Sequence, residues 1–471
     1  MTDPLSGFPS GVASDGPRIW LDGFPLAFPK GTGISTYTRG VAMTLRGQRA
    51  RLGLLYGRML PAELDPMERE VRFFDAAGPV RRHLALRLLR LALGPRGPTA
   101  EPVHRQDVVE TGLASAAPAS RFSTASVPPA EELWNADDLF GRGRVHLAIT
   151  RRLMPVRVGG TPPALMHWMQ AHPLRLVGAP NIYTIHDLIP LRLPWSTMEP
   201  KRAWLRMVRE IARTADHIVT VSEHSRRDII ALLGVDPSRV TNTYQPVFPP
   251  PPGLDEGMAL ARLRGAHGLE PRGYFLFIST IEPRKNLARL LDAYLASGSE
   301  TPVVIVGGRG HGAKRELRLL TEADGTRGAG GRIRHLGYVP RLDVDLLLRH
   351  AKALLFPSLY EGFGLPVIEA MQGGTAVLTS STSCLPEVAG DAALLVDPTD
   401  TRALAEGLRA LDADAGLRGR LEAAGPARAA LFSAERYAAR LGALHARLGV
   451  PLPGTGVPLP GAGILSPGAG A

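Results

Sequence analysis

Short apolar runs alternate with amphipathic stretches along most of the chain, which is typical of strands followed by helices. In the first half, an apolar run at 18–22 predicts a strand, and a glycine loop with a helical stretch to Leu45 follows it. Further runs at 181–187 and 217–221 predict two more strands. Helical patterns follow these at 199–215 and 222–233, the second with Ser222 as its expected N-cap.

The same alternation restarts after a proline cluster at 246–252, which interrupts regular structure and marks a linker. Strands alternating with helices predict parallel sheets covered on both faces, so we expect two doubly wound α/β domains that face each other. The strands predicted in the second block are 274–279, 302–306, 353–356 and 376–378, and the helices are 286–296, 365–372 and 401–411.

These patterns define the expected domains. We place an N-terminal Rossmann-like domain at 17–248 and a C-terminal one at 265–433. A final helix at 434–449 could pack back on the first domain. Residues 98–129, rich in Ala, Ser and Pro, predict a loop or insertion, and the Pro- and Gly-rich stretch 451–471 predicts a disordered tail.

Charge and composition narrow the function only slightly. Lys and Arg outnumber Asp and Glu by 55 to 44 in 471 residues, so nucleic acid, a phospholipid surface, a sugar diphosphate or plain solvation all fit. The single cysteine, Cys384, predicts a reducing compartment, and we expect the cytoplasm. No apolar run reaches the roughly 18 residues of a membrane span, so any membrane contact is expected to be peripheral.

The strongest chemical signal is Ser358-Leu-Tyr-Glu361-Gly-Phe-Gly364-Leu-Pro366-Val-Ile-Glu369. A strand, a glycine loop and a helix opened by Pro366 present free backbone N–H groups and a helix dipole to a phosphate. Glu361 on the loop lies nearer a transferred sugar, whereas Glu369, one turn into the helix, suits the two hydroxyls of a ribose. The alternative is two surface glutamates beside an ordinary turn.

Three further motifs accompany it. Arg284-Lys285 follows a predicted strand and could offset diphosphate charge, or be a solvated basic turn. His186-Asp187 ends another strand, where the histidine could donate to a sugar hydroxyl, line the reacting face or be structural. The Gly31-Thr-Gly33 loop could bring amides to the diphosphate from the opposite wall. No metal-ligand cluster and no suitable Asp-x-Asp occur, so we expect neither a metal nor a cofactor.

Together these residues resemble family 4 glycosyltransferases, retaining enzymes of the GT-B fold, in the variant of bacterial polysaccharide assembly. Glu361 to Glu369 looks like the E-x7-E motif of that family, and Glu282-Pro-Arg-Lys-Asn286 like its phosphate-binding stretch. Tyr183 to Pro190 and Val221 to Ser225 look like the polysaccharide-assembly members. Many members carry an Arg where this chain has Ser279-Thr280.

The resemblance implies roles for these positions. Arg284 and Lys285 would bind the donor diphosphate, Glu361 the donor sugar and Glu369 the ribose, with His186 beside the reacting sugar. The amides of Gly362, Phe363, Gly364 and Leu365 would bind the sugar and the β-phosphate. It further implies that the acceptor hydroxyl attacks the face the diphosphate leaves, so that a phosphate oxygen, not a protein base, takes the proton.

The expected activity is therefore transfer of a mannose- or glucose-type hexose from a GDP- or UDP-linked donor to a lipid-linked or polysaccharide acceptor. A nicotinamide-dependent oxidoreductase is one alternative, weakened by the missing G-x-G-x-x-G with an acidic partner. A nucleic-acid-binding protein is another, without a supporting signature. Residues 81–93 form a basic amphipathic stretch that could lie on an anionic membrane or be buried on the sheet.

Overall fold

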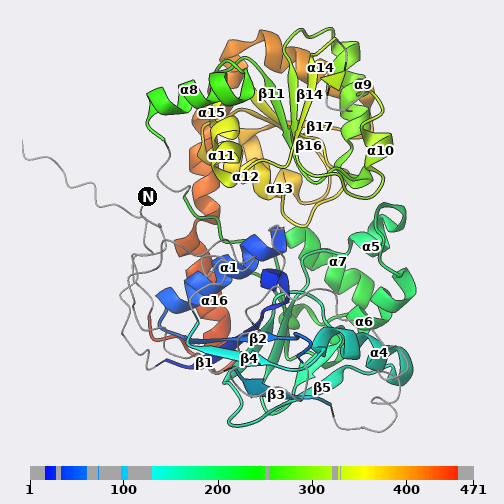
Figure 1. The fold of residues 1–471 in the computed structure, drawn as a ribbon, viewed down its shortest axis with the longest axis vertical. Coiled ribbons are helices and arrows are strands. Elements are labelled where there is room, and N and C mark those ends of the chain that lie inside the picture. Colours follow the sequence, from blue (N-terminus) through cyan, green and yellow to red (C-terminus); the bar gives the residue numbers. More distant parts are fainter. Residues whose placement is uncertain are drawn as a thin grey trace, which may run out of the picture.

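The computed structural model describes residues 16–27, 33–60, 73, 97–103, 130–249, 254–320, 327–328 and 330–454. Two α/β units lie one above the other, each with a central sheet and helices on its faces (Figure 1). The predicted basic helix at 81–93 lies outside the described residues. So do residues 104–129 of the predicted insertion and 455–471 of the predicted tail.

The first sheet has the strand order β10-β9-β8-β6-β1-β2-β4-β3-β5-β7 among the described residues, and its pairs are parallel except β3 with β4. Its strands are β1 (Arg18–Asp22), β2 (Arg51–Tyr56), β3 (Thr99–Pro102), β4 (Glu132–Asn135), β5 (Met154–Val158), β6 (Leu165–Trp168), β7 (Leu174–Leu176), β8 (Asn181–Thr184), β9 (His217–Thr220) and β10 (Val240–Asn242). Its helices are α1 (Gly33–Gly47), α4 (Leu139–Thr150), α5 (Ile189–Arg192), α6 (Lys201–Thr214) and α7 (Glu223–Leu233). The predicted N-cap of α7 is confirmed, because the Ser222 side chain accepts a hydrogen bond from the Ser225 N–H.

Strand β3 corrects the sequence prediction, which assigned a loop from residue 98 onward. Residues Thr99–Pro102 pair antiparallel with β4 and parallel with β5, and Ala100 is fully buried. The sequence Thr-Ala-Glu-Pro has weak strand propensity, so pairing with strands distant in sequence decides its structure.

The second sheet has the order β13-β14-β12-β11-β15-β16-β17 in the described part of the chain, parallel except β13 with β14. The predicted strand at 353–356 and helix at 365–372 are confirmed with the same bounds. The strands are β11 (Phe275–Ile278), β12 (Val303–Val306), β13 (Arg327–Gly328), β14 (Ile333–Gly337), β15 (Ala353–Phe356), β16 (Val377–Ser380) and β17 (Leu394–Val396). The helices are α8 (Glu256–His267), α9 (Leu287–Ser297), α10 (Ala313–Glu316), α11 (Arg341–His350), α12 (Leu365–Gln372), α13 (Leu385–Ala389) and α14 (Thr401–Ala413).

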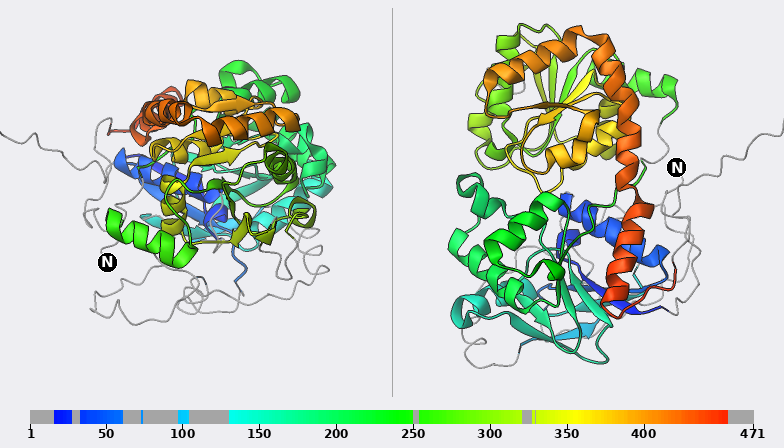
Figure 2. Two further views of the ribbon diagram at one scale, coloured as in Figure 1. Left: turned by 90° about the horizontal axis from the view of Figure 1, so that it is seen from above. Right: turned by 180° about the vertical axis from the view of Figure 1, so that it is seen from behind.

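Two C-terminal helices connect the units. Helix α15 (Ala415–Ala429) lies on the second unit, and α16 (Ala434–Arg447) runs down beside the first (Figure 2). Gln48 at the end of α1 donates from Nε2 to the Ala438 carbonyl at 2.9 Å, and the fully buried Tyr437 hydroxyl lies 3.5 Å from that of Tyr37. Helix α16 therefore packs against α1.

A second contact between the units is electrostatic. Glu387 of α13 accepts hydrogen bonds from the N–H groups of Glu223 and His224, at 2.7 and 3.0 Å. These groups lie at the N-terminus of α7, where the helix dipole favours a negative charge. Among the helices described, none combines the length and apolar character needed to cross a bilayer.

Candidate active site

The basic pair and the loop glutamate meet at the carboxyl ends of neighbouring strands. Arg284 and Lys285 lie in a 3-10 helix, Pro283–Lys285, after β11, and Glu361 lies on the loop after β15. Strands β11 and β15 pair in parallel, so these loops leave the same edge of the sheet. Arg284 Nη1 donates to Glu361 Oε2 at 2.8 Å, and Lys285 Nζ donates to Oε1 at 2.5 Å.

The pKa values of these buried groups depend on burial and on one another. Burial favours the neutral form of Glu361, but Arg284 and Lys285 outweigh it and lower its pKa to about 2. Burial lowers the pKa of Lys285, and the attraction of Glu361 only partly offsets this effect. Glu282 also contacts Arg284, with Arg284 Nε 2.7 Å from its Oε1. In this structure, both cations thus contact carboxylates.

The glycine loop after Glu361 lies against the first unit. A Cβ atom at Gly362 would be 2.8 Å from the carbonyl oxygen of His186 and 3.1 Å from Asp187 Oδ2. Gly364 caps α12 with a φ of 94°, a conformation that favours glycine. Leu365 then begins the helix, whose first N–H groups lack intrahelical partners. The main chain here thus combines close approach with available donors.

The Phe363 side chain takes no part in this loop surface. It is 4 % exposed, and its ring packs against those of Tyr244 and Phe432, with centroids 6.5 and 5.4 Å away. Its carbonyl accepts a hydrogen bond from the thiol of Cys384, which is fully buried. Cys384 is therefore a core residue, and Phe363 can offer a ligand only its backbone N–H.

Glu369 binds a different cation from Glu361. Its Oε1 accepts a hydrogen bond from Arg341 Nη1 of α11 at 2.7 Å, and Arg341 also contacts Asp345 at 2.7 Å. The Glu369 side chain is only 13 % exposed, and burial raises its pKa despite Arg341. Glu361 and Glu369 therefore have different partners: Glu361 contacts Arg284 and Lys285, and Glu369 contacts Arg341.

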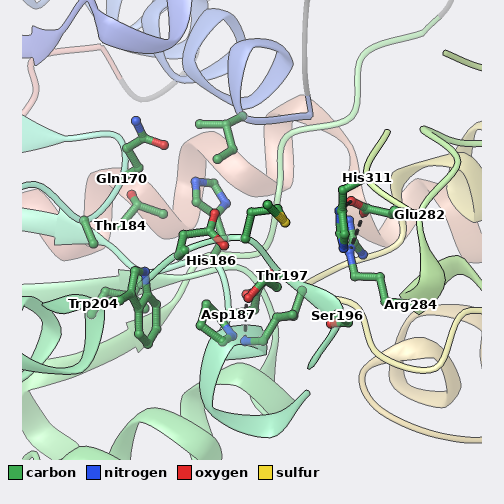
Figure 3. Close-up of a pocket in the computed structure, with 17 residues that line it drawn as sticks. Gln170, Thr184, His186, Asp187, Ser196, Thr197, Trp204, Glu282, Arg284 and His311 are labelled. Carbon is green, nitrogen blue, oxygen red and sulfur yellow. Dashed lines mark hydrogen bonds and ion pairs between the residues drawn. The ribbon is translucent and has the colours of Figure 1, made fainter. Parts of the chain in front are cut away.

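A pocket of about 410 Å³ lies between the two units (Figure 3). His186 and Asp187 form part of the wall from the first unit, and Glu282, Arg284 and His311 form the opposite wall. Ile34 of the first turn of α1 also lines the pocket, whereas the predicted site residue Gly33, which begins that helix, does not. The remaining lining residues are Gln170, Ala171, Thr184, Ile185, Ile189, Pro190, Ser196, Thr197, Met198, Glu199 and Trp204.

His186 offers an acceptor rather than a donor to this pocket. Its Nε2 lies 2.9 Å from the Met169 carbonyl, so Nε2 carries the proton and donates it. Burial lowers the pKa of His186 to about 4, which leaves Nδ1 unprotonated at neutral pH. The expectation that His186 donates to a sugar hydroxyl is thus replaced by the expectation that it lines the reacting face. Burial also raises the pKa of the neighbouring Asp187 to about 6.

Several pocket residues were missed from the sequence. Glu282 stood inside the predicted basic motif without a role, and His311 directly follows the Gly307–Gly310 run, which could be a diphosphate loop or only a turn. Gln170 and Trp204 carry no local signal, because their place beside the pocket depends on the packing of β6 and α6. Within the described ranges, no group of three or more His, Cys, Asp or Glu residues is arranged to hold a metal ion.

Comparison with protein families agrees with this arrangement. Residues 137–247 match the model described as Glycosyltransferase Family 4, and residues 262–428 match that described as Glycosyl transferases group 1. The O-antigen chain mannosyltransferase B of Escherichia coli is 37 % identical over 235 residues, which are 47 % of this chain and 58 % of that protein. The serotype-specific mannosyltransferase WbdA of Escherichia coli is 28 % identical over 54 % of this chain and 32 % of its own length. The chain thus spans less than two thirds of these curated relatives.

Solved structures share the whole architecture. The sucrose-phosphate synthase of Thermosynechococcus elongatus aligns with a TM-score of 0.60 at 16 % identity, over 92 % of this chain and 99 % of that one. The Anabaena protein HepE, solved in complex with UDP and glucose, aligns with a TM-score of 0.59 at 16 % identity, over 92 % and 100 %. The two matched models, the curated relatives and this two-unit architecture show that the chain belongs to the family 4 glycosyltransferases and has the GT-B fold.

Proposed function

We propose that this protein is a retaining hexosyltransferase that transfers mannose from a nucleotide-linked donor to a growing glycan. The observation that carries the proposal is the Arg284–Lys285–Glu361 cluster, whose Arg284 lines a pocket bordered by both units. Mannose is favoured over glucose because both relatives above are named mannosyltransferases, one of them of O-antigen chains. Family membership favours transfer over the oxidoreductase and nucleic-acid alternatives.

The basic pair supplies the electrostatic part of the mechanism. When the donor binds, Arg284 and Lys285 exchange part of their contact with Glu361 for contact with the diphosphate. Negative charge grows on the β-phosphate as it leaves, and cations already fixed by Glu361 and Glu282 stabilise that charge without reorganisation. The N-terminus of α12, with the N–H groups of Leu365 and its neighbours, adds to this stabilisation.

The reaction needs no base from the protein. The oxygen of the acceptor hydroxyl forms a bond to the anomeric carbon, and the bond from that carbon to the β-phosphate oxygen breaks. The nucleoside diphosphate leaves with the electron pair, and the proton of the hydroxyl passes to a departing phosphate oxygen on the same face. His186, with its pKa of about 4, is a weak base, which agrees with a role in lining the sugar.

The two ends of the donor are assigned to different residues. Glu361 orients the hexose while its cations hold the diphosphate, and Glu369 accepts hydrogen bonds from the ribose hydroxyls after exchanging contact with Arg341. The acceptor enters from the first unit, whose residues make up most of the pocket wall. We expect it to be a glycan or a lipid-linked glycan.

We further propose that the enzyme acts in the cytoplasm with peripheral contact to an anionic membrane. Helix α6 supports this, because Arg202, Arg206 and Arg209 are exposed on it. None of the three has a carboxylate partner within the described part of the chain. Each basic side chain near an anionic bilayer contributes about 1 kcal/mol of binding free energy.

A ligand panel tests the proposed function. We expect GDP or UDP to raise the melting temperature of the protein, and Arg284→Ala to remove that shift. With GDP-mannose and a mannose glycoside as acceptor, the wild-type protein should release GDP and form an α-linked product. Absence of both stabilisation by any nucleoside diphosphate and turnover with any sugar nucleotide would overturn the proposal.

A further inference from the structure

A second pocket, of about 740 Å³, adjoins the first. On the first unit it is lined by Leu193 and Trp195, whereas the next residues, 196–199, line the first pocket. Residues of both units therefore line this pocket as well. In Figure 1, α5 of the first unit lies below α10 of the second at the boundary between the units. Its volume lies within the range of about 300–1,000 Å³ that ligand sites occupy.

On the second unit, too, neighbouring residues of one segment line the two pockets. Pro283 and Asn286 line the second pocket, whereas Glu282 and Arg284 line the first. Both pockets are thus bordered by the same two chain segments, 193–199 and 282–286. A ligand longer than the first pocket can continue over these segments into the second.

The aromatic side of the second pocket is Trp195. This residue lies in the 3-10 helix Pro194–Ser196, and its side chain is 61 % exposed. No partner for its indole N–H is found among the residues described. An exposed indole presents a flat apolar face together with one hydrogen-bond donor, which is suited to a ligand that is apolar on one face and polar at its edge.

The polar side comes from α9, α10 and the residues just after α10. Arg318 pairs with Asp292 at 2.5 Å, and Arg289 is held by the Pro398 carbonyl at 3.1 Å. Arg315 of α10 lines the same pocket and has no ion-pair partner in the ranges that the structure covers. Guanidinium donors and a carboxylate acceptor in a pocket that also holds an indole ring are able to bind several hydroxyl groups at once.

We propose that this second pocket binds the distal sugar residues of a glycan acceptor, with one ring stacked on Trp195 and hydroxyls bound by Arg315 and Asp292. This proposal rests on the proposed function, since the reacting end of the same glycan occupies the first pocket. It adds a chain-length preference: longer acceptors gain contacts that a monosaccharide cannot reach. Neutral sugars suit the pocket, because Arg318 is paired with Asp292 and Arg289 already donates to a carbonyl oxygen.

The test compares acceptors of different length in matched variants. With GDP-mannose as donor, Trp195→Ala should raise the KM for mannohexaose about three- to tenfold, as expected for the loss of one aromatic contact. The KM for methyl mannoside should stay unchanged. Trp195→Tyr, which keeps an aromatic face, should restore most of the loss, and Ile149→Ala, 63 % exposed on α4 and outside both pockets, should have no effect.

Direct binding of mannohexaose, measured by calorimetry, separates this proposal from the proposed function. If the wild type binds the hexasaccharide more tightly than Trp195→Ala does but transfers no sugar, the second pocket stands and the function falls. If transfer occurs and both acceptors behave alike in the two proteins, the second pocket falls. Weaker binding of Trp195→Ala to anionic vesicles, with an unchanged KM for mannohexaose, would identify Trp195 as a lipid anchor and overturn the proposal.

Discussion

Gly362 lies against His186 so closely that a Cβ atom at position 362 would be 2.8 Å from the His186 carbonyl oxygen. The two residues belong to different units, so this contact sets how near the glycine loop comes to the first domain. A backbone oxygen cannot move aside as a flexible side chain would. The glycine loop and the segment that follows β8 can therefore approach this closely only while residue 362 is glycine.

The first prediction follows from this contact. Gly362→Ala should force the units apart locally, displace Glu361 and lower kcat/KM by about a hundredfold, the scale expected for a misplacement of about 1 Å. The melting temperature should change little, because the strain is relieved at the boundary between the units. Gly160→Ala is the matched control, since a Cβ there would meet nothing within 4 Å. Unchanged kcat/KM in Gly362→Ala would show that this approach is unimportant.

The second prediction concerns the buried ion pair of Lys285 and Glu361. Lys285→Met should abolish most transfer and lower the free energy of unfolding by about 1–3 kcal/mol, because it leaves a buried carboxylate with one cation fewer. Adding Glu361→Gln should recover much of the stability and none of the transfer. Urea unfolding and product formation measure the two effects separately.

A distant ion pair provides the control for this experiment. Lys352 Nζ lies 2.7 Å from Asp412 Oδ1, and neither residue lines the candidate site. Lys352→Met should lower the free energy of unfolding while kcat/KM stays at the wild-type value. If Lys285→Met lowers the free energy of unfolding but leaves kcat/KM unchanged, as Lys352→Met should, the proposed phosphate role of Lys285 is wrong.

The third prediction separates ribose recognition from diphosphate recognition. Glu369→Gln should raise the Kd for GDP about tenfold or more, because a charged acceptor for the ribose hydroxyls is lost. The Kd for inorganic pyrophosphate should not change, since that ligand has no ribose. Asp345→Asn removes the other carboxylate at Arg341 and should leave both constants near wild type. An equal loss of affinity for GDP and pyrophosphate in Glu369→Gln would place Glu369 at the phosphates instead.

Local signals in the sequence were sufficient for much of this site. The helix at 365–372 was predicted with its observed bounds, because Gly364 and Pro366 mark its start and an apolar strand precedes the loop. The edge of the sheet was also predictable, since Arg284 and Glu361 each follow a strand of a parallel sheet. Such features depend on neighbours along the chain.

Features that depend on distant residues were not predictable in this way. The sequence assigned Arg284 and Lys285 to phosphate and Glu361 to sugar, whereas the structure pairs these cations with that carboxylate. That pairing follows from β11 lying beside β15 and is invisible to local reasoning. The His186 tautomer is fixed by the hydrogen bond that its Nε2 donates to the Met169 carbonyl, just after another strand. Likewise, the Phe363 ring packs in the core against that of Phe432, which is distant in sequence.

The fourth prediction is that acid weakens the attachment of α16. His445 of this helix is fully buried, and neither of its ring nitrogens has a hydrogen-bond partner among the described residues. Burial lowers its pKa from 6.5 to about 4. In the window between these values the unfolded chain binds a proton that the folded chain does not, so the free energy of unfolding rises with pH. The free energy of unfolding is therefore lower at pH 4 than at pH 6.5.

His445→Leu removes the imidazole that takes up a proton in the unfolded chain. It also removes two unpaired nitrogen atoms from a buried position in the folded chain. The slope of unfolding free energy against pH should decrease by at most about 1.4 kcal/mol per pH unit, the contribution of one proton. Some slope should remain, because burial lowers the pKa values of His186 and His217 to about 4 as well. Urea titrations through the window measure the slopes, and hydrogen exchange should show α16 opening first in the acidified wild type. Equal slopes in both proteins would mean that His445 stays neutral in the unfolded chain or reaches solvent in the folded one, and the attachment of α16 would then be insensitive to acid.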